Sequence, residues 1–241
     1  IMAFNTKLPI VTDGLILSVD PYNKKSYVSG GTTCVDLTKN KYPGTLNNGV
    51  TYDDFSWGFN GTNQDVEINT GLGVTQPSLP ITIDLWVKVN TTPSPLLGVI
   101  ALDKKVTSYY GVGVSVSASN DMSLNIGDGA GFSSTNRRTI TTPNNSITVG
   151  EWVHVTAVFV DAVTYDMTCY IDTVDVGGTT SGTGGAIAWS SDSSSRTLLA
   201  NTWGNNSFYA EIDLSQVNVY NRELTIDEIK QNHNALKYRF R

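Results

Sequence analysis

Apolar and polar residues alternate along much of this chain, and that alternation predicts β-strands. The clearest case is ITIDLWVKV at residues 81–89, where every odd position carries Ile, Leu or Val and the even positions carry Thr, Asp, Trp and Lys. Period two over nine residues predicts a strand with one buried face. Residues 152–160 alternate in the same way, but both faces are mostly apolar, which predicts burial on both sides. Weaker patterns predict further strands at 15–19, 66–68, 112–116, 122–126, 138–142, 168–171, 174–176, 197–200 and 214–220.

Turn-forming residues separate these segments. Gly, Asn and Thr dominate from Gly30 to Gly49, which predicts loops, and Asp172-Thr173 is expected to turn a hairpin. About a dozen short strands without helical crossovers predict an all-β fold, either a two-sheet antiparallel sandwich or a barrel. The chain has no internal repeat and no long linker, so residues 1–241 are expected to form a single domain.

One helix is well signalled, near the C-terminus. Thr225 is a good N-cap, Glu228 completes a capping box, and Leu224 can pack against Ile229 as a hydrophobic staple. The helix is expected to close one end of the sandwich. Its packing face is expected to comprise Ile226, Ile229, His233 and Leu236, with His233 as a packing residue rather than a ligand.

Composition excludes several classes of function. The 241 residues include only 16% charged residues and carry a net charge of −6. Nucleic acid is therefore not an expected partner, because binding it relies on neutralising phosphates with Lys and Arg. No apolar run approaches the ~18 residues of a membrane span, so no membrane partner is expected either. The two cysteines, Cys34 and Cys169, are predicted to be free thiols. The first residues show no secretory signal, which favours synthesis and folding in a cytoplasm.

Several segments resemble a known family when they are taken in order. They are IVTDGLILSVDPYNKKSY, GTTCVDLTKNKYPGTLNNGVTY, FNGTNQDVEI, ITIDLWVKV, GEWVHVTAVF with MTCYIDTVDV, and LSQVNVYNRELTIDEIKQNHNALKYRF. Together they span nearly the whole chain, which resembles the laminin-G-like, concanavalin A-like jelly-roll domains of tailed-phage and marine-virus structural proteins. The resemblance implies a two-sheet antiparallel jelly-roll sandwich with a short C-terminal helix.

The resemblance also implies a function. The preferred interpretation is a non-enzymatic virion protein, either a capsid decoration or a tail- or fibre-associated domain. It would be made in the host cytoplasm and contact other virion proteins, copies of itself, or host-surface glycans. The main alternative is a lectin-like module of a cellular surface or secreted protein. A glycoside hydrolase is a remote alternative.

Catalytic groups are sparse. Glycanases of this architecture carry two carboxylates on one strand face, whereas the matching strand here offers only Asp84, which is expected to lie on the solvent side or rim. Of the two histidines, His154 matches a structural histidine of the family. GDGAGF at 127–132 lacks the Lys-Ser/Thr of a phosphate loop and is expected to be a turn. No catalytic residue is therefore assigned.

No cofactor is expected to be required, although a structural calcium ion is left open. Asn60, Asn63 and Gln64 stand where the family often carries Asp, and Cys34 stands where Trp is common. The amides keep oxygen ligands but lose the charge that calcium favours. The candidate ligands are Asp65 and Asp213.

Sugar binding is the main candidate chemistry, because lectins stack an aromatic ring on the apolar face of a sugar and bond its hydroxyls with polar side chains. The proposed platform is Trp203 with Asn201, Asn205 and Asn206, supported by Trp189 and Tyr110. The alternative for each ring is that it caps an end of the sandwich.

Overall fold

Two antiparallel β-sheets face each other in the computed structural model, which describes residues 8–69, 76–93, 96–103, 108–191, 196–202 and 208–240. The first sheet comprises β1 (Leu15–Val19), β4 (Thr51–Tyr52), β5 (Trp57–Gly58), β7 (Ile81–Val89), β12 (Trp152–Asp161), β13 (Asp166–Ile171), β14 (Val174–Asp175) and β17 (Ile212–Tyr220). Their order is β14-β13-β12-β7-β17-β5-β4, with β1 also paired to β17.

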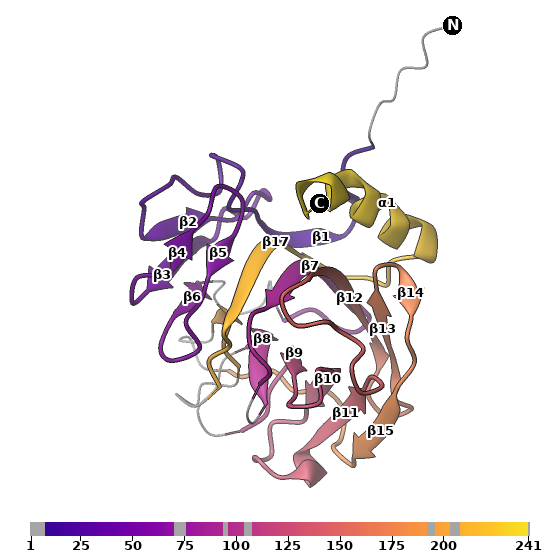
Figure 1. Ribbon diagram of the computed structural model, residues 1–241. Coiled ribbons are helices and arrows are strands. Elements are labelled where there is room, and N and C mark those ends of the chain that lie inside the picture. Colours follow the sequence, from indigo (N-terminus) through magenta and orange to yellow (C-terminus); the bar gives the residue numbers. More distant parts are fainter. Residues whose placement is uncertain are drawn as a thin grey trace, which may run out of the picture.

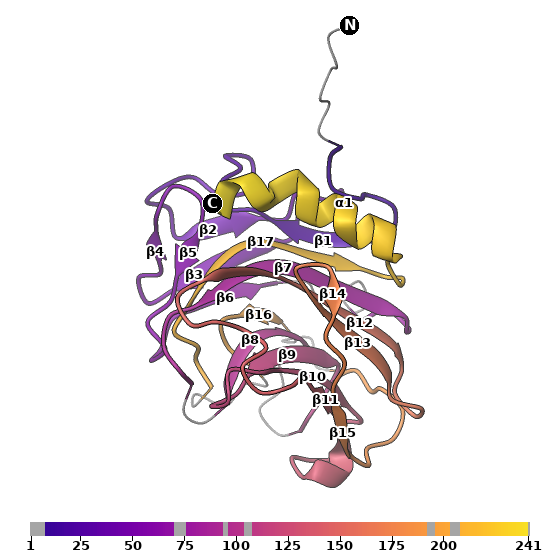
Figure 2. The ribbon, with the colours of Figure 1, turned by 45° about the vertical axis from the view of Figure 1, so that its right-hand side comes forward.

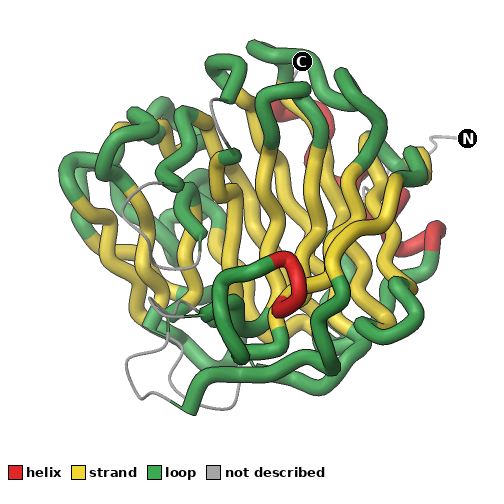
Figure 3. The backbone as a smooth tube through the Cα atoms, turned by 90° about the horizontal axis from the view of Figure 1, so that it is seen from below, coloured by secondary structure: helices red, strands yellow, loops and turns green. Residues whose placement is uncertain are grey.

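The second sheet has the order β15-β11-β10-β9-β8-β16-β6-β3-β2. Its strands are β2 (Thr33–Val35), β3 (Pro43–Asn47), β6 (Asp65–Ile68), β8 (Leu97–Leu102), β9 (Val112–Val116), β10 (Met122–Gly127), β11 (Arg137–Thr141), β15 (Thr179–Gly182) and β16 (Thr197–Leu199). The helical elements are α1 (Ile226–Leu236) and the single 3-10 turns η1 (Ser134–Asn136) and η2 (Lys237–Phe240). Figure 1 shows the two layers, and Figure 3 shows the strands from below, running side by side. The predicted antiparallel sandwich is confirmed.

The core lies between the sheets and is built from alternate side chains of each strand. Ile83 and Val87 of β7 and Phe159 of β12 are fully buried there, together with Trp57 of β5. Burying an aliphatic or aromatic side chain of this size contributes about 1.5–3 kcal/mol, so these rows hold the two sheets together. Cys34 and Cys169 are buried, unbridged core residues, which confirms the prediction of free thiols.

Local signals decide where the strand predictions succeed. The hairpin at Asp172-Thr173 is confirmed, since Ile171 pairs with Val174 across it. The prediction that residues 30–49 are loops is wrong, because β2 and β3 form the edge of the second sheet there. In β3 only Gly44 and Leu46 are buried, so its alternation lacks the run of large apolar residues that marks β7.

The C-terminal helix begins as predicted but lies elsewhere. Both hydrogen bonds of the capping box between Thr225 and Glu228 are present, and Leu224 packs in one buried cluster with Ile229. Instead of closing one end of the sandwich, α1 lies across the outer face of the first sheet (Figure 2). The expected packing face is also partly wrong, because Ile226 is 38% exposed whereas Asn232 is fully buried.

The placement of α1 changes the environment of β7. Thr82, Asp84 and Trp86 point away from the core, yet all three are buried. His233 of α1 and Phe240 of η2 stack on Trp86, with ring centroids 5.4 and 4.2 Å away. The strand predicted to have one solvent face is therefore covered on both faces, and the packing role expected for His233 is confirmed. Among the described residues, α1 is too short and too polar to cross a membrane.

Candidate functional site

The sugar platform expected from the sequence falls largely outside the described residues, because Trp203, Asn205 and Asn206 all lie there. Asn201 is described and is only 1% exposed. Its Nδ2 donates to Asp65 Oδ2 at 3.1 Å, and its Oδ1 accepts from the Thr202 backbone at 2.8 Å. The structure therefore gives the Asn201 side chain a role in holding the fold, with little surface for a ligand.

Trp189 and Tyr110 are half-buried and lie on joined segments. The N–H of Gly111 donates to Ala188 O at 2.8 Å, which brings the two aromatic residues to the same end of the second sheet. Trp189 packs against the hydrophobic core, and a Cβ on Gly111 would lie 2.5 Å from its ring. For Trp189, these contacts match the alternative in which such a ring caps the sandwich.

Asp65 and Asp213, the two candidate calcium ligands, lie on different sheets. Asp65 accepts hydrogen bonds from Asn47 Nδ2 at 2.8 Å and from Asn201. Asp213 forms an ion pair with Lys88 at 2.5 Å and accepts from Asn90 Nδ2 at 3.0 Å. The structure does not join the two carboxylates in one site, and in its described part no cluster of three His, Cys, Asp or Glu could hold a metal.

The loop in which amides replace the carboxylates of the family is held by those amides. Gln64 Oε1 accepts from the Asn60 backbone at 2.9 Å, and Gln64 Nε2 donates to the carbonyl oxygens of Asn48 and Gly49 at 3.0 and 2.6 Å. Gln64 is only 7% exposed. The Gln64 amide therefore bonds the Asn60 backbone N–H on one side and the backbone oxygens of Asn48 and Gly49 on the other, so this side chain bridges two loops.

Asp84 is not at the rim, which corrects the expectation from the sequence. It is 1% exposed beneath α1, and His154 Nε2 lies 3.0 Å from its Oδ2. Thr156 Oγ1 donates to the same carboxylate at 2.9 Å and Asn218 Nδ2 at 3.4 Å. Burial alone would raise the pKa of Asp84, but His154 and these hydrogen bonds outweigh it and hold the pKa below its usual value.

The contact between His154 and Asp84 is short, although neither ring nitrogen of His154 has a partner in hydrogen-bond geometry among the described residues. His154 is fully buried, as a structural histidine was expected to be. The pair therefore links β7 to β12 under the helix, and neither group is open to a substrate in this structure.

A pocket with aromatic walls opens where the loop after β1, the β4–β5 hairpin and η2 meet. We call it the tyrosine pocket, a cavity of about 650 Å³. It is lined by Asp20, Tyr22, Asn23, Lys24, Tyr27, Ser29, Tyr52, Asp54 and Arg239. In Figure 2 the C-terminal end of the chain lies beside β2, β4 and β5, which places η2 next to these loops.

Aromatic rings pack closely at the base of the tyrosine pocket. Tyr27 is only 4% exposed, and its ring lies 5.0 Å from that of Tyr52 and 5.5 Å from that of Trp57. Tyr52 Oη donates to Asp54 O at 2.6 Å. Burial, followed by the nearby charge of Asp54, raises the pKa of Tyr52, so its phenol stays protonated at neutral pH.

The rim of the tyrosine pocket is open and charged. Tyr22 is 58% exposed, and the guanidinium of Arg239 lies 4.7 Å from its ring centroid. Arg239 Nη1 is 3.0 Å from both carboxylate oxygens of Asp20, which fixes η2 against the loop after β1. An exposed ring beside fixed donors and acceptors can hold a polar ligand that has an apolar face.

The sequence prediction missed this pocket, although one local signal was present. The segment PYNKKSY directly after the first strand carries two tyrosines among polar residues, and loops on a rigid scaffold often bind ligands. Tyr52 and Arg239 lie far from this segment in the sequence, so no local pattern could assign them to the same pocket.

The fold defines the class of this protein as an antiparallel two-sheet β-sandwich of the concanavalin A-like kind. The concanavalin A-like lectin/glucanases superfamily matches residues 60–230, and this chain belongs to that superfamily. No curated protein matches the sequence.

Solved structures share the fold at low sequence identity. A Trypanosoma rangeli sialidase in complex with sialic acid has a TM-score of 0.64 and 13% identity, covering 97% of this chain and 36% of that chain. The botulinum neurotoxin serotype D binding domain has a TM-score of 0.64 and 13% identity, covering 90% of this chain and 51% of that one. This chain therefore spans about a third to a half of the length of these proteins.

Proposed function

We propose that this chain is a non-enzymatic glycan-binding domain and that the tyrosine pocket is its site. The observation that carries the proposal is the exposed ring of Tyr22 in one pocket with the buried Tyr27 and the half-buried Tyr52, together with the charges of Arg239 and Asp54. A sugar presents an apolar face and a ring of hydroxyls, and this combination of a closely packed aromatic base and a polar rim complements both. Membership of a superfamily of lectins and glucanases is consistent with such a ligand.

The environment of Asp84 supports the non-enzymatic part of the proposal. Hydrolysis of a glycosidic bond normally needs two carboxylates about 5–10 Å apart that both reach the substrate. Asp84, the one acid that the sequence offered for this role, is buried and already holds His154, Thr156 and Asn218. We therefore expect no release of reducing sugar from any polysaccharide that the protein binds.

The test is glycan binding by wild type and Tyr22→Ala on a glycan array, followed by calorimetry on the best ligand. We expect Tyr22→Ala to weaken binding by on the order of tenfold or more, because an exposed aromatic anchor is lost. The melting temperature should change by only a few degrees, since Tyr22 is mostly exposed. Phe132→Ala removes an aromatic residue of similar exposure, 43%, between β10 and η1, and serves as the matched control.

Trp203→Ala distinguishes the two candidate sites. If Trp203→Ala abolishes binding while Tyr22→Ala does not, the tyrosine pocket is refuted and the platform expected from the sequence takes its place. If wild type binds no glycan, with or without calcium, the glycan-binding proposal itself fails.

A role in a virion is a second proposal and rests on different ground. What supports it is the resemblance of the closing segment, residues 214–240, to tailed-phage structural proteins, together with the sandwich fold. It predicts that the chain is found in purified virions and contacts other virion proteins or copies of itself. Mass spectrometry of purified particles tests it, and absence of the chain from them would refute it.

A further inference from the structure

A second cavity adjoins the tyrosine pocket, and the two share one boundary. The second cavity, of about 470 Å³, lies between the N-terminal segment, β1 and the C-terminal helical turns. Asp20, Asn23 and Arg239 line both cavities, so the ion pair between Asp20 and Arg239 separates them. A ligand with at least two units could therefore occupy both cavities across this ion pair.

One part of the wall of the second cavity is apolar. Leu15 and Leu37 are half-buried along one side, and Leu236 from the end of α1 is 5% exposed. A ligand group packed here gains free energy by covering aliphatic surface. A sugar hydroxyl placed against these leucines would not do so, because it would lose water without gaining a hydrogen-bond partner there.

The floor of the same cavity is polar and incompletely bonded. Gln216 lines it and is only 4% exposed; its Nε2 donates to Asn218 Oδ1 at 3.2 Å. Its Oε1 is buried and has no hydrogen-bond partner in the described part of the chain. Buried polar atoms are nearly always bonded in folded proteins, so an acceptor without a donor indicates a missing partner. Because this oxygen is buried, a ligand in the cavity reaches it only when the Gln216 side chain changes its rotamer.

A ligand group that suits this cavity needs a small apolar end and an N–H donor close to it. An alkyl chain would cover the leucines but leave Gln216 Oε1 unpaired, and a hydroxyl would do the opposite. An acetamido group supplies both, because its methyl can pack on the leucines while its N–H donates to the amide oxygen.

We propose that the second cavity accepts the N-acetyl group of an amino sugar that is linked to the unit held in the tyrosine pocket. This inference rests on the proposed glycan-binding function and narrows it to N-acetylated oligosaccharides that cross the Asp20–Arg239 ion pair. Arg239 then has a positioning role, because it forms one wall of each cavity.

Matched ligand pairs test the inference. An array carrying pairs that differ only by acetamido in place of hydroxyl, with chitotriose and cellotriose among them, is bound to wild type, Tyr22→Ala and Gln216→Met. Wild type should favour the N-acetylated member by roughly fivefold, the ratio that one hydrogen bond of ordinary net strength gives. Tyr22→Ala should weaken both members of a pair alike, whereas Gln216→Met should remove most of the preference.

Two controls keep the outcome decisive. In Gln216→Met the new side chain has nearly the same volume as the glutamine, and thermal unfolding checks that the variant folds. Leu37→Ala alters the half-buried wall without touching the polar floor, and it should also reduce the preference for the N-acetylated ligand. Binding of glycans with no preference for acetamido overturns this inference alone. A preference that persists in both Gln216→Met and Leu37→Ala overturns the assignment to this cavity, and no glycan binding at all overturns the proposed function itself.

Discussion

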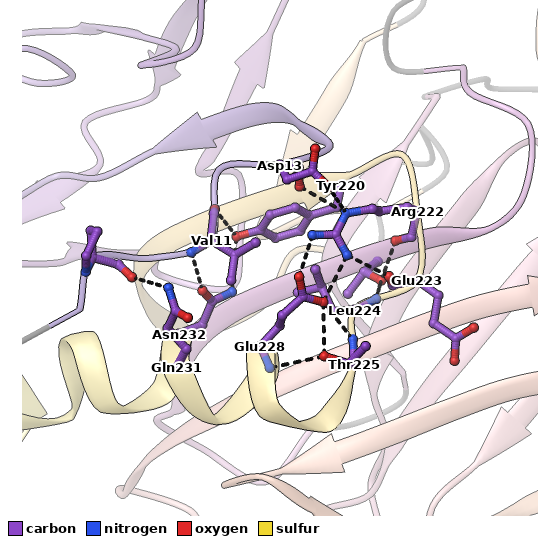
Figure 4. A network of polar contacts seen from close by, with 12 residues as sticks. Val11, Asp13, Tyr220, Arg222, Glu223, Leu224, Thr225, Glu228, Gln231 and Asn232 are labelled. Atoms are coloured by element: carbon purple, nitrogen blue, oxygen red, sulfur yellow. Dashed lines mark hydrogen bonds and ion pairs between the residues drawn. The ribbon is translucent and has the colours of Figure 1, made fainter.

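Replacing Glu228 with glutamine is expected to loosen the C-terminal helix from the first sheet. Glu228 lies in the first turn of α1, where its two oxygens accept from Arg222 Nη1 and Nη2 at 2.9 and 2.7 Å. Its Oε2 also accepts from the Thr225 backbone at 2.9 Å (Figure 4). Arg222 extends the contact to Asp13, with 3.0 Å between Nε and Oδ2, so one carboxylate connects the helix to the N-terminal segment.

The size of the effect follows from the pKa of Glu228. The bonds from Arg222 are the main cause that lowers this pKa from 4.5 to about 2. At about 1.36 kcal/mol per pH unit, the difference sets a ceiling of about 3 kcal/mol on what the ionised form contributes to stability. The side chain is 27% exposed, so water screens the pair, and we expect Glu228→Gln to lower the free energy of unfolding by about 1–2 kcal/mol at pH 7.

The sign of the pH dependence follows from the direction of the shift. Because the pKa is lower in the folded protein, the contribution is complete above pH 4.5 and is lost as the pH falls toward 2. Glu228→Gln and wild type should therefore differ at pH 7 and converge near pH 2. Urea unfolding followed by tryptophan fluorescence measures both, since Trp86 lies against His233 of α1.

Glu223→Gln is the matched control, because Glu223 is exposed and its side chain lies outside the capping box. It should change the free energy of unfolding by less than about 0.5 kcal/mol. A loss in Glu228→Gln that is equally small at pH 7, or one that is the same at pH 7 and pH 2, would refute the reasoning.

Three further predictions concern the interior. Burial raises the pKa of the Cys34 and Cys169 thiols to about 12, so neither should react with a thiol reagent at pH 8 until urea unfolds the protein; rapid labelling of the native state would contradict this. Asp84→Ala leaves His154 without its partner and should cost about 3–5 kcal/mol in urea unfolding, and a cost below 1 kcal/mol would show that the pair does not hold the strands. Gly111→Ala should lower the melting temperature by several degrees, because Gly111 has a φ of +62° and faces a backbone carbonyl at close range; an unchanged melting temperature would argue against that packing.

The interior of the sandwich was predictable because its strands carry a strong local signal. The nine residues of β7 alternate without a break, and β12 carries mostly apolar residues on both faces, which the structure buries over most of the strand. The capping box was equally clear, since Thr225 and Glu228 are three residues apart. These features depend on neighbours in the sequence, so a pattern search finds them.

The outer face of the first sheet was not predictable in the same way. Asp84 alternates with apolar residues and so has the pattern of a solvent-facing position, yet α1 covers it. Asp84, the carboxylate that the sequence offered as a candidate catalytic acid, is buried and lies against His154. Periodicity gives the face of a strand on which a residue lies, but a covering helix decides whether that face meets water.

The tyrosine pocket depends on the same covering segment. Tyr22 follows β1, whereas Arg239 lies in η2, the turn that continues α1, and its guanidinium lies over the Tyr22 ring. Arg239 also bonds Asp20, which is 219 positions earlier in the sequence, and this contact brings the two segments together. The network at Glu228 fixes the start of α1, and the helix fixes the place from which η2 reaches the loop after β1. The residues that anchor the helix therefore also position one wall of the proposed binding site, although none of them lines it.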